Sequence, residues 1–134
     1  MDAIHSDDIG QQPPVSWKLS GALADLERDG ELEFVRDLIE TFLRDTAARL
    51  ENLRKAAAAE DLDALAACSH TLKGSMLLMS ANRPAELCCE IQMQAAEKKH
   101  RDYLAMVDRL EILLQETRKA MISHADALAR SAVG

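Results

Sequence analysis

Residues 32–53 read LEFVRDLIETFLRDTAARLENL, and this stretch decides the fold class. Its apolar side chains recur every three or four residues, which is the spacing of one face of an α-helix. With its flanks, the pattern continues for about seven turns and predicts one long amphipathic helix. The stripe expected to face a core consists of Leu32, Val35, Ile39, Phe42, Thr46, Arg49 or Leu50, and Leu53.

Four further segments carry the same period. We expect a short helix over residues 17–28, with Ser16 as its N-cap and Asp29-Gly30 at its end, and three longer helices after residue 60. The expected ranges of those three helices are 62–81, 84–97 and Tyr103 to about Leu128.

Capping signals separate these helices. Glu60-Asp61 mark a tight connection, with Asp61 as the next N-cap. Asn82 suits the left-handed conformation that often ends a helix, and Pro84 suits the first position of the following helix. Short connections make consecutive helices antiparallel. The sequence therefore predicts an all-α fold, an antiparallel up-and-down four-helix bundle with an extra short N-terminal helix.

The length of 134 residues allows one domain. Residues 1–15 are polar and end close to Pro13-Pro14, which predicts a flexible N-terminal tail ahead of a bundle domain over residues 16–130. We expect a monomer, because the long helices already find partners within the bundle.

The composition excludes several classes of protein. Aromatic residues make up 3% of the chain, too few for a β-sandwich or for a platform that stacks single-stranded nucleic acid. A formal charge of −7 disfavours binding to nucleic acid or to an anionic membrane surface. The N-terminus lacks the basic and apolar regions of a signal peptide, and the three cysteines form no CxxC pair. We therefore expect reduced thiols in a cytoplasmic protein.

One face of the 62–81 helix departs from the amphipathic pattern. His70 lies roughly 135° from the centre of the apolar stripe and Gly74 nearly opposite it, with Lys73 at the rim. An exposed glycine inside a helix lowers the stability of the helix by about 1 kcal/mol relative to alanine. Gly74 is therefore either a neutral substitution that the fold tolerates, or a position where another molecule approaches the backbone closely.

The same face is small and apolar where a solvated face should be charged, which indicates a docking surface. The alternative is that the N-terminal helix covers part of it, Leu78 above all. The residues that share the face are Ala67, His70, Gly74, Leu77, Leu78 and Ala81.

A lone exposed imidazole limits the chemistry. Hydrolysis would need an orienting acid and an oxyanion site, and a metal would need several converging ligands; the sequence around His70 shows none of these. An unprotonated imidazole nitrogen can accept a phosphoryl group near neutral pH. Lys73 would then neutralise phosphate oxygens. His124, on the apolar stripe of the last helix, is expected to be a satisfied, part-buried histidine.

The segment His70-Thr71-Leu72-Lys73-Gly74-Ser75, followed by Met79-Ser80-Ala81, resembles the motif of histidine phosphotransfer (HPt) domains. That motif reads His-x-Leu-Lys-Gly-Ser and then Gly-Ala, and the likeness extends over about residues 20–115. Two positions depart from the family pattern: Ser80 stands where glycine is usual, and Gln92 where glutamate is frequent.

The resemblance implies a phosphorelay intermediate of two-component signal transduction, without independent kinase activity. Such domains take a phosphoryl group from the aspartate of a response-regulator receiver domain or a hybrid histidine kinase and pass it to another receiver. They have no cofactor of their own, and the receiver supplies Mg²⁺. The implied roles are His70 as phosphoacceptor, Lys73 as phosphate contact and Gly74 as the point of close approach, with Ala67, Leu77, Leu78 and Ala81 against the receiver.

Two alternatives remain open. One is a helical adaptor that binds a receiver or a kinase and is never phosphorylated. The other is the phosphoacceptor domain of a larger chemotaxis-type kinase, which shares this bundle.

Overall fold

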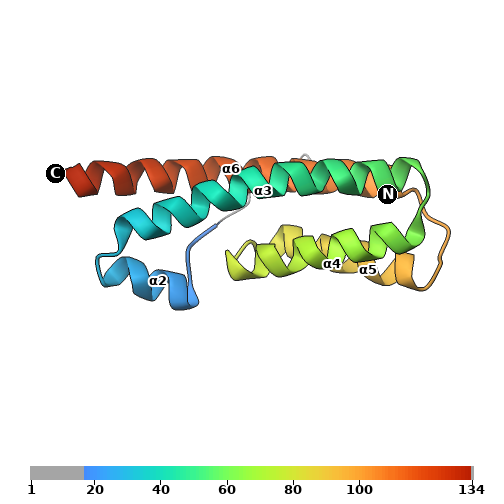
Figure 1. The fold of residues 1–134 in the computed structure, drawn as a ribbon, viewed down its shortest axis with the longest axis horizontal. Helices are drawn as coiled ribbons and strands as arrows, with labels where there is room; N and C mark the ends of the chain where they lie inside the picture. The colour runs from blue at the N-terminus through green and yellow to red at the C-terminus, as the bar shows by residue number, and fades with distance from the viewer. Residues whose placement is uncertain (1–16, 134) are drawn as a thin grey trace, which may run out of the picture.

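Two long helices, α3 (Leu32–Ala58) and α6 (Tyr103–Val133), lie side by side along the molecule (Figure 1). They belong to a computed structural model that describes residues 17–133. The predicted tail over residues 1–15 and the predicted N-cap Ser16 lie outside the described residues. Between the long helices, the chain forms the shorter α4 (Leu62–Leu78) and α5 (Asn82–Ala96), and a short α2 (Gly21–Arg28) precedes α3.

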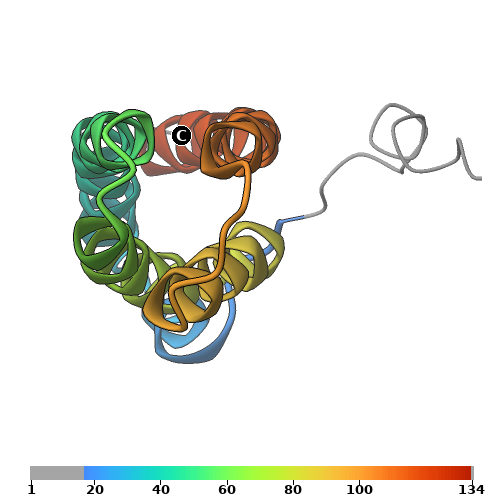
Figure 2. The same cartoon turned by 90° about the vertical axis from the view of Figure 1, so that its right-hand side faces the viewer.

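The four main helices surround one core (Figure 2). Each packs against its neighbours in chain order, and α6 closes the ring against α3, while α2 packs on α3. This arrangement confirms the predicted bundle with an additional short helix. No strand occurs within residues 17–133, and no helix in that range is long and apolar enough to cross a membrane.

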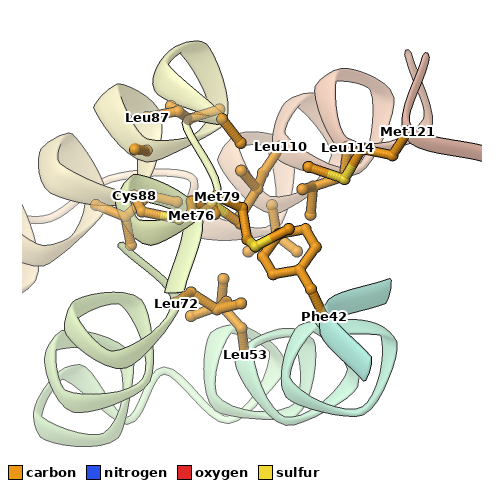
Figure 3. Close-up of a cluster of buried hydrophobic side chains, with 14 of the residues drawn as sticks. Phe42, Leu53, Leu72, Met76, Met79, Leu87, Cys88, Leu110, Leu114 and Met121 are labelled. Carbon is orange, nitrogen blue, oxygen red and sulfur yellow. Dashed lines mark hydrogen bonds between the residues drawn. The ribbon is translucent and has the colours of Figure 1, made fainter. Parts of the chain in front are cut away.

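The core is built from the predicted apolar stripes (Figure 3). Met76 of α4 lies between the stripes of α3, α5 and α6, and its sulfur is 3.6 Å from the Cys88 sulfur. Burying a side chain of this kind contributes about 1.5–3 kcal/mol relative to leaving it exposed. The largest fully buried side chains are Val35, Ile39, Leu53, Leu65, Leu72, Met76, Pro84, Ile91, Val107, Leu110, Thr117 and Met121.

The connection after α3 follows the prediction, but the connection after α4 does not. Asp61 caps α4 by accepting a hydrogen bond from the backbone nitrogen of Ala64 at 3.1 Å. Helix α4 ends at Leu78, earlier than expected, and Ser80 rather than Asn82 takes the left-handed conformation, with φ of 60°. Asn82 is already the first residue of α5, so the predicted role of Asn82 is wrong.

The N-terminal segment attaches to this connection. Trp17 Nε1 donates a hydrogen bond of 2.7 Å to the Met79 carbonyl oxygen, and the hydroxyls of Ser20 and Ser80 are 2.6 Å apart. These contacts hold residues 17–20 outside a helix, and α2 therefore begins at Gly21 instead of at residue 17. His124 is half-buried beside the Trp17 ring and bonds to Glu27 at 2.9 Å, which confirms it as a satisfied histidine.

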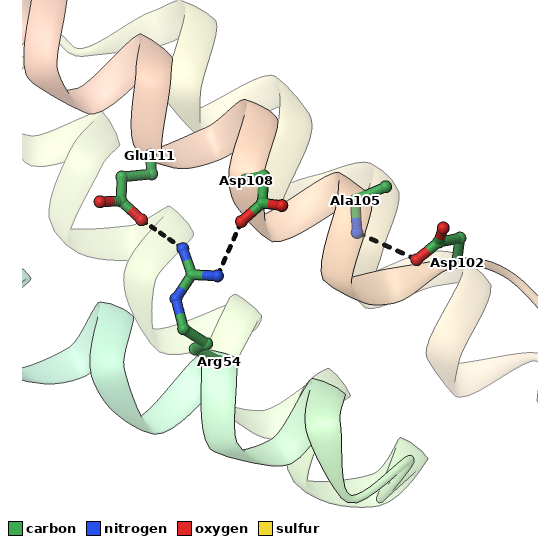
Figure 4. A network of polar contacts seen from close by, with 5 residues as sticks. All are labelled: Arg54, Asp102, Ala105, Asp108 and Glu111. Atoms are coloured by element: carbon green, nitrogen blue, oxygen red, sulfur yellow. Dashed lines mark hydrogen bonds and ion pairs between the residues drawn. The ribbon is translucent and has the colours of Figure 1, made fainter.

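Ion pairs of Arg54 with Asp108 and Glu111 join α3 to α6 (Figure 4). The Arg54 guanidinium binds Asp108 at 2.7 Å and also pairs with Glu111. The hydrogen bond to Asp108 is the main cause that raises the pKa of Arg54, with Glu111 adding to it against the opposing effect of burial. Asp102 accepts from the Ala105 backbone nitrogen at 3.1 Å and so satisfies a donor at the start of α6.

Candidate functional site

His70 lies on the outer face of α4, at the middle of the helix. The core-facing residues of α4 are Leu65, Ser69, Leu72 and Met76, and they place His70 on the exposed side. Ser69 is buried but satisfied, because its hydroxyl donates to the Leu65 carbonyl oxygen at 2.6 Å. Packing of α4 against α3 and α5 therefore fixes the backbone that carries His70.

A glutamine from α5 orients the His70 ring. The amide nitrogen Nε2 of Gln92 lies 3.1 Å from Nδ1 of His70, and the amide oxygen of Gln92 is buried without a hydrogen-bond partner among the described residues. A carboxamide and an imidazole can pair in two ways: the amide NH₂ donates to an unprotonated Nδ1, or the amide oxygen accepts from Nδ1–H. Only the second pairing leaves a lone pair on Nε2, the ring nitrogen that does not contact Gln92. The structure has the amide nitrogen toward Nδ1, which is the first pairing, and a flip of the carboxamide that exchanges its nitrogen and oxygen gives the second.

In the sequence, Gln92 stands out only as a departure from the family pattern, and its contact with His70 was not predicted. Its neighbour Ile91 is fully buried, and Gln92 follows at the edge of the buried stripe, on the flank of α5 that faces α4. A polar residue at the edge of a stripe on a neighbouring helix is the signal that could have identified it.

Lys73 lies one turn after His70, half-buried at the rim of the same face. It makes no ion pair within residues 17–133, so its ammonium group remains available to an external anion. Its positive charge acts on α5: burial, reinforced by Cys89, raises the pKa of Cys88 to about 12, and Lys73 opposes that rise. The charge of Lys73 therefore lies close enough to α5 to act on the Cys88 thiol.

Gly74 has no role in the fold itself. A Cβ atom added at Gly74 would meet no atom within 4 Å, and the residue is exposed in mid-helix. Alanine would fit this position and would favour the helix. The observation removes internal packing as an explanation and leaves close approach of another molecule, or tolerated drift, as the reason for glycine.

The predicted apolar surface around His70 is present with one exception. Leu77 and Leu78 are 54% and 69% exposed, and Ala67 is exposed as well. The N-terminal helix therefore does not cover Leu78. Ala81, by contrast, is 2% exposed, so its predicted place in the docking surface is wrong. The helix ends at Leu78, and the left-handed Ser80 turns Ala81 into the core, where its backbone nitrogen donates to the Met76 carbonyl at 2.8 Å.

The site brings together an oriented imidazole, a cation and an open strip of helix backbone. Within residues 17–133, no group of three or more His, Cys, Asp or Glu side chains could hold a metal ion. The described site thus offers one nucleophilic nitrogen, charge neutralisation and access, and it relies on another molecule for further catalytic groups.

Residues 37–120 match the Hpt domain in a comparison with protein families. The chain belongs to the Hpt domain family. The match covers more than half of the chain and includes all of α4 and α5, so the site lies entirely inside the Hpt domain. This assignment confirms the resemblance inferred from the His70–Ser75 motif and identifies a phosphotransfer protein.

Among solved structures, the Hpt domain is similar to histidine-containing phosphotransfer protein B (HptB) from Pseudomonas aeruginosa PAO1. The TM-score is 0.73 at 27% sequence identity, and the alignment covers 78% of this chain and 90% of that chain. A search of curated proteins gave no match. Hpt domains interact with receiver domains and have no intrinsic cofactor.

Proposed function

We propose that this Hpt domain is a relay intermediate that accepts a phosphoryl group on His70 from the aspartate of a receiver domain and passes it to another receiver. The observation that carries the proposal is the exposed His70 ring, held by Gln92 at Nδ1, beside a glycine that the fold does not need.

The proposed step is an attack by the Nε2 lone pair of His70 on the phosphorus of an aspartyl phosphate. The N–P bond forms while the P–O bond to the aspartate breaks, and the carboxylate leaves with the bond electrons. The step needs the flipped Gln92 carboxamide, in which the amide oxygen accepts a hydrogen bond from Nδ1–H, so that Nδ1 keeps its proton and the positive charge on the ring is shared with a hydrogen-bond acceptor. Transfer to a second receiver is the reverse of this step.

Lys73 would bind the phosphoryl oxygens during the transfer and offset their charge. Mg²⁺ would come with the receiver and neutralise the phosphoryl group from the other side. Binding in the complex converts a bimolecular encounter into an oriented attack and so lowers the barrier through proximity.

Ala67, Leu77 and Leu78 would contact the receiver around His70. Their exposure and apolar character support this role, because a contiguous apolar surface of this kind marks protein docking sites. We further propose that the protein acts as a monomer in the cytoplasm. The free thiols of Cys68, Cys88 and Cys89 suit a reducing compartment.

The deciding experiment mixes the protein with Mg²⁺ and receiver domains phosphorylated on aspartate. We expect label that is lost in acid and stable in base on the wild type and on His100→Gln, an exposed-histidine control, and none on His70→Gln. Binding without label on any variant would favour the unphosphorylated adaptor, and label on His70→Gln would place the acceptor elsewhere.

A further inference from the structure

Arg49 of α3 reaches across to the helix that carries His70. Its Nη1 donates a hydrogen bond of 2.7 Å to the Ser75 hydroxyl of α4. Ser75 follows Gly74 directly, and both Arg49 and Ser75 are half-buried. The contact therefore fixes a guanidinium at the α3 edge of the face that contains Gly74.

Within residues 17–133, Arg49 lacks the anionic partner that Arg54 of the same helix and Lys98 of the turn after α5 have. Arg54 binds Asp108 and Glu111 across α3 and α6, and Lys98 pairs with Asp63. Over residues 17–133, Arg49 makes no ion pair, and its bond to Ser75 uses one of five N–H donors. Four donors and a full positive charge thus remain for a group from outside the chain.

Lys73 and Arg49 lie on opposite flanks of the site. Lys73 and Ser75 are the two neighbours of Gly74 in sequence, and each projects roughly 100° to one side of it. The Lys73 flank is also the side of His70, which contacts Gln92 of α5, and the Ser75 flank faces α3 through Arg49. A molecule that approaches the backbone at Gly74 therefore meets one cation on each side.

The distance from His70 determines what Arg49 can do. Ser75 lies five residues beyond His70, an axial rise of about 7.5 Å on the helix, and on a different side of it. A guanidinium bonded to Ser75 is thus offset from the phosphoryl group on the His70 ring and is placed against the body of the docked partner.

We infer that Arg49 is a docking and specificity residue, which binds a carboxylate on the surface of the receiver domain beside its phosphorylated aspartate. The inference rests on the proposed function. Ser75 is a positioning residue that holds the guanidinium toward the partner. Receivers with an acidic side chain at the matching place would be preferred over receivers with a neutral or basic one.

The test compares the kinetics of phosphoryl transfer from a panel of phosphorylated receivers to variants at position 49. We expect Arg49→Ala to raise KM about twofold to fivefold, the range of a partly exposed ion pair, and Arg49→Glu to raise KM about tenfold or more through like-charge repulsion. The kcat should stay at the wild-type value, because Arg49 does not contact the reacting atoms. Arg49→Lys should retain part of the effect.

Salt provides a second readout that a merely structural role would not change. The KM of the wild type should rise more steeply with ionic strength than that of Arg49→Ala, which has lost a charge pair. The matched control is Arg44→Glu, an exposed arginine of α3 whose side chain, among residues 17–133, bonds only to Thr41 of the same helix at 3.5 Å, and it should leave KM near the wild-type value. Thermal unfolding of each variant checks the fold.

The outcomes separate the two proposals. If the wild type transfers phosphate and Arg49→Glu matches it in KM and in salt dependence, the role of Arg49 is overturned and the proposed function stands. If Arg49→Lys and Arg49→Glu both lose kcat, Arg49 serves the fold or the chemistry and the docking role is also overturned. If the wild type neither accepts phosphate nor binds any receiver in calorimetry, both proposals fail.

Discussion

Gln92 of α5 and His70 of α4 meet at 3.1 Å between the Gln92 carboxamide and the His70 Nδ1 atom. This contact joins the two helices of the bundle that form the site, and it distinguishes the two nitrogens of one imidazole ring. The ring orientation is thus set by the packing of α4 against α5 rather than by α4 alone.

Replacing Gln92 by alanine should lower the rate of phosphoryl transfer about tenfold, because a ring that rotates freely attacks in the right orientation less often. Imidazole ¹⁵N chemical shifts of the unphosphorylated wild type should show the proton on Nδ1. Gln94→Ala is the control, since Gln94 bonds to Glu90 and Arg101 instead. A transfer rate in Gln92→Ala equal to that of Gln94→Ala would remove Gln92 from the mechanism.

Gly74→Ala should separate stability from function. We expect the free energy of unfolding to rise by about 1 kcal/mol, because alanine favours the helix and the added methyl group meets no other atom of the protein within 4 Å. Transfer should fall about tenfold to a hundredfold, because the methyl group displaces the partner from its closest approach. Denaturant unfolding and transfer kinetics on the same sample measure both effects.

Gly30→Ala serves as the control for that substitution. Gly30 has φ of 87° in the turn before α3, so alanine there should lower stability and leave transfer unchanged. A Gly74→Ala protein with wild-type transfer would show that Gly74 is tolerated drift.

Ser80→Gly should stabilise the protein. Ser80 adopts φ of 60°, a conformation that costs a residue with a side chain roughly 1–2 kcal/mol, and the gain is reduced by the greater freedom of glycine in the unfolded chain. We expect a net rise of about 0.5–1 kcal/mol in the free energy of unfolding. Ser20→Ala measures the hydroxyl contact with Ser80 separately. A lower melting temperature for Ser80→Gly would mean that this contact outweighs the backbone strain.

Cys88 should weaken the fold at alkaline pH. Burial raises its pKa from 9.0 to about 12 in the folded protein. Above pH 9 the unfolded chain loses the thiol proton while the folded protein keeps it, so the unfolded state gains stability up to about pH 12. Cys88→Ala should therefore lose less stability than the wild type between pH 8 and about pH 10. Identical pH dependence in the two proteins would contradict the raised pKa.

Helical periodicity predicted the bundle because burial of one stripe per helix outweighs the local preferences of the other residues. The prediction from periodicity failed at α4, which ends at Leu78, before its expected end at residue 81. Ala81 was placed on the docking face by extending the phase of α4 through residue 81, but the left-handed Ser80 breaks that phase. Hydrophobic periodicity gives no sign that Ser80 adopts a left-handed conformation, which is usually adopted by glycine.

The residues of the site also fall into those that the sequence predicted and those that it did not. His70, Lys73 and Gly74 share one helix, so their spacing alone predicted that they lie on one face. Gln92 and Arg49 come from α5 and α3, and their contacts with α4 depend on the register between helices, which the sequence of a single helix does not encode. Contacts within a helix were therefore predictable, and contacts between helices required the structure.

Trp17 is the single tryptophan of the chain, and its indole touches the end of α4 and the His124 ring of α6. Its fluorescence therefore reports on the segment ahead of α2 without an added dye. Release of the indole from the Met79 carbonyl would expose it to water and shift its emission to the red, while the bundle could remain folded. Emission and circular dichroism recorded together would distinguish detachment of this segment from global unfolding.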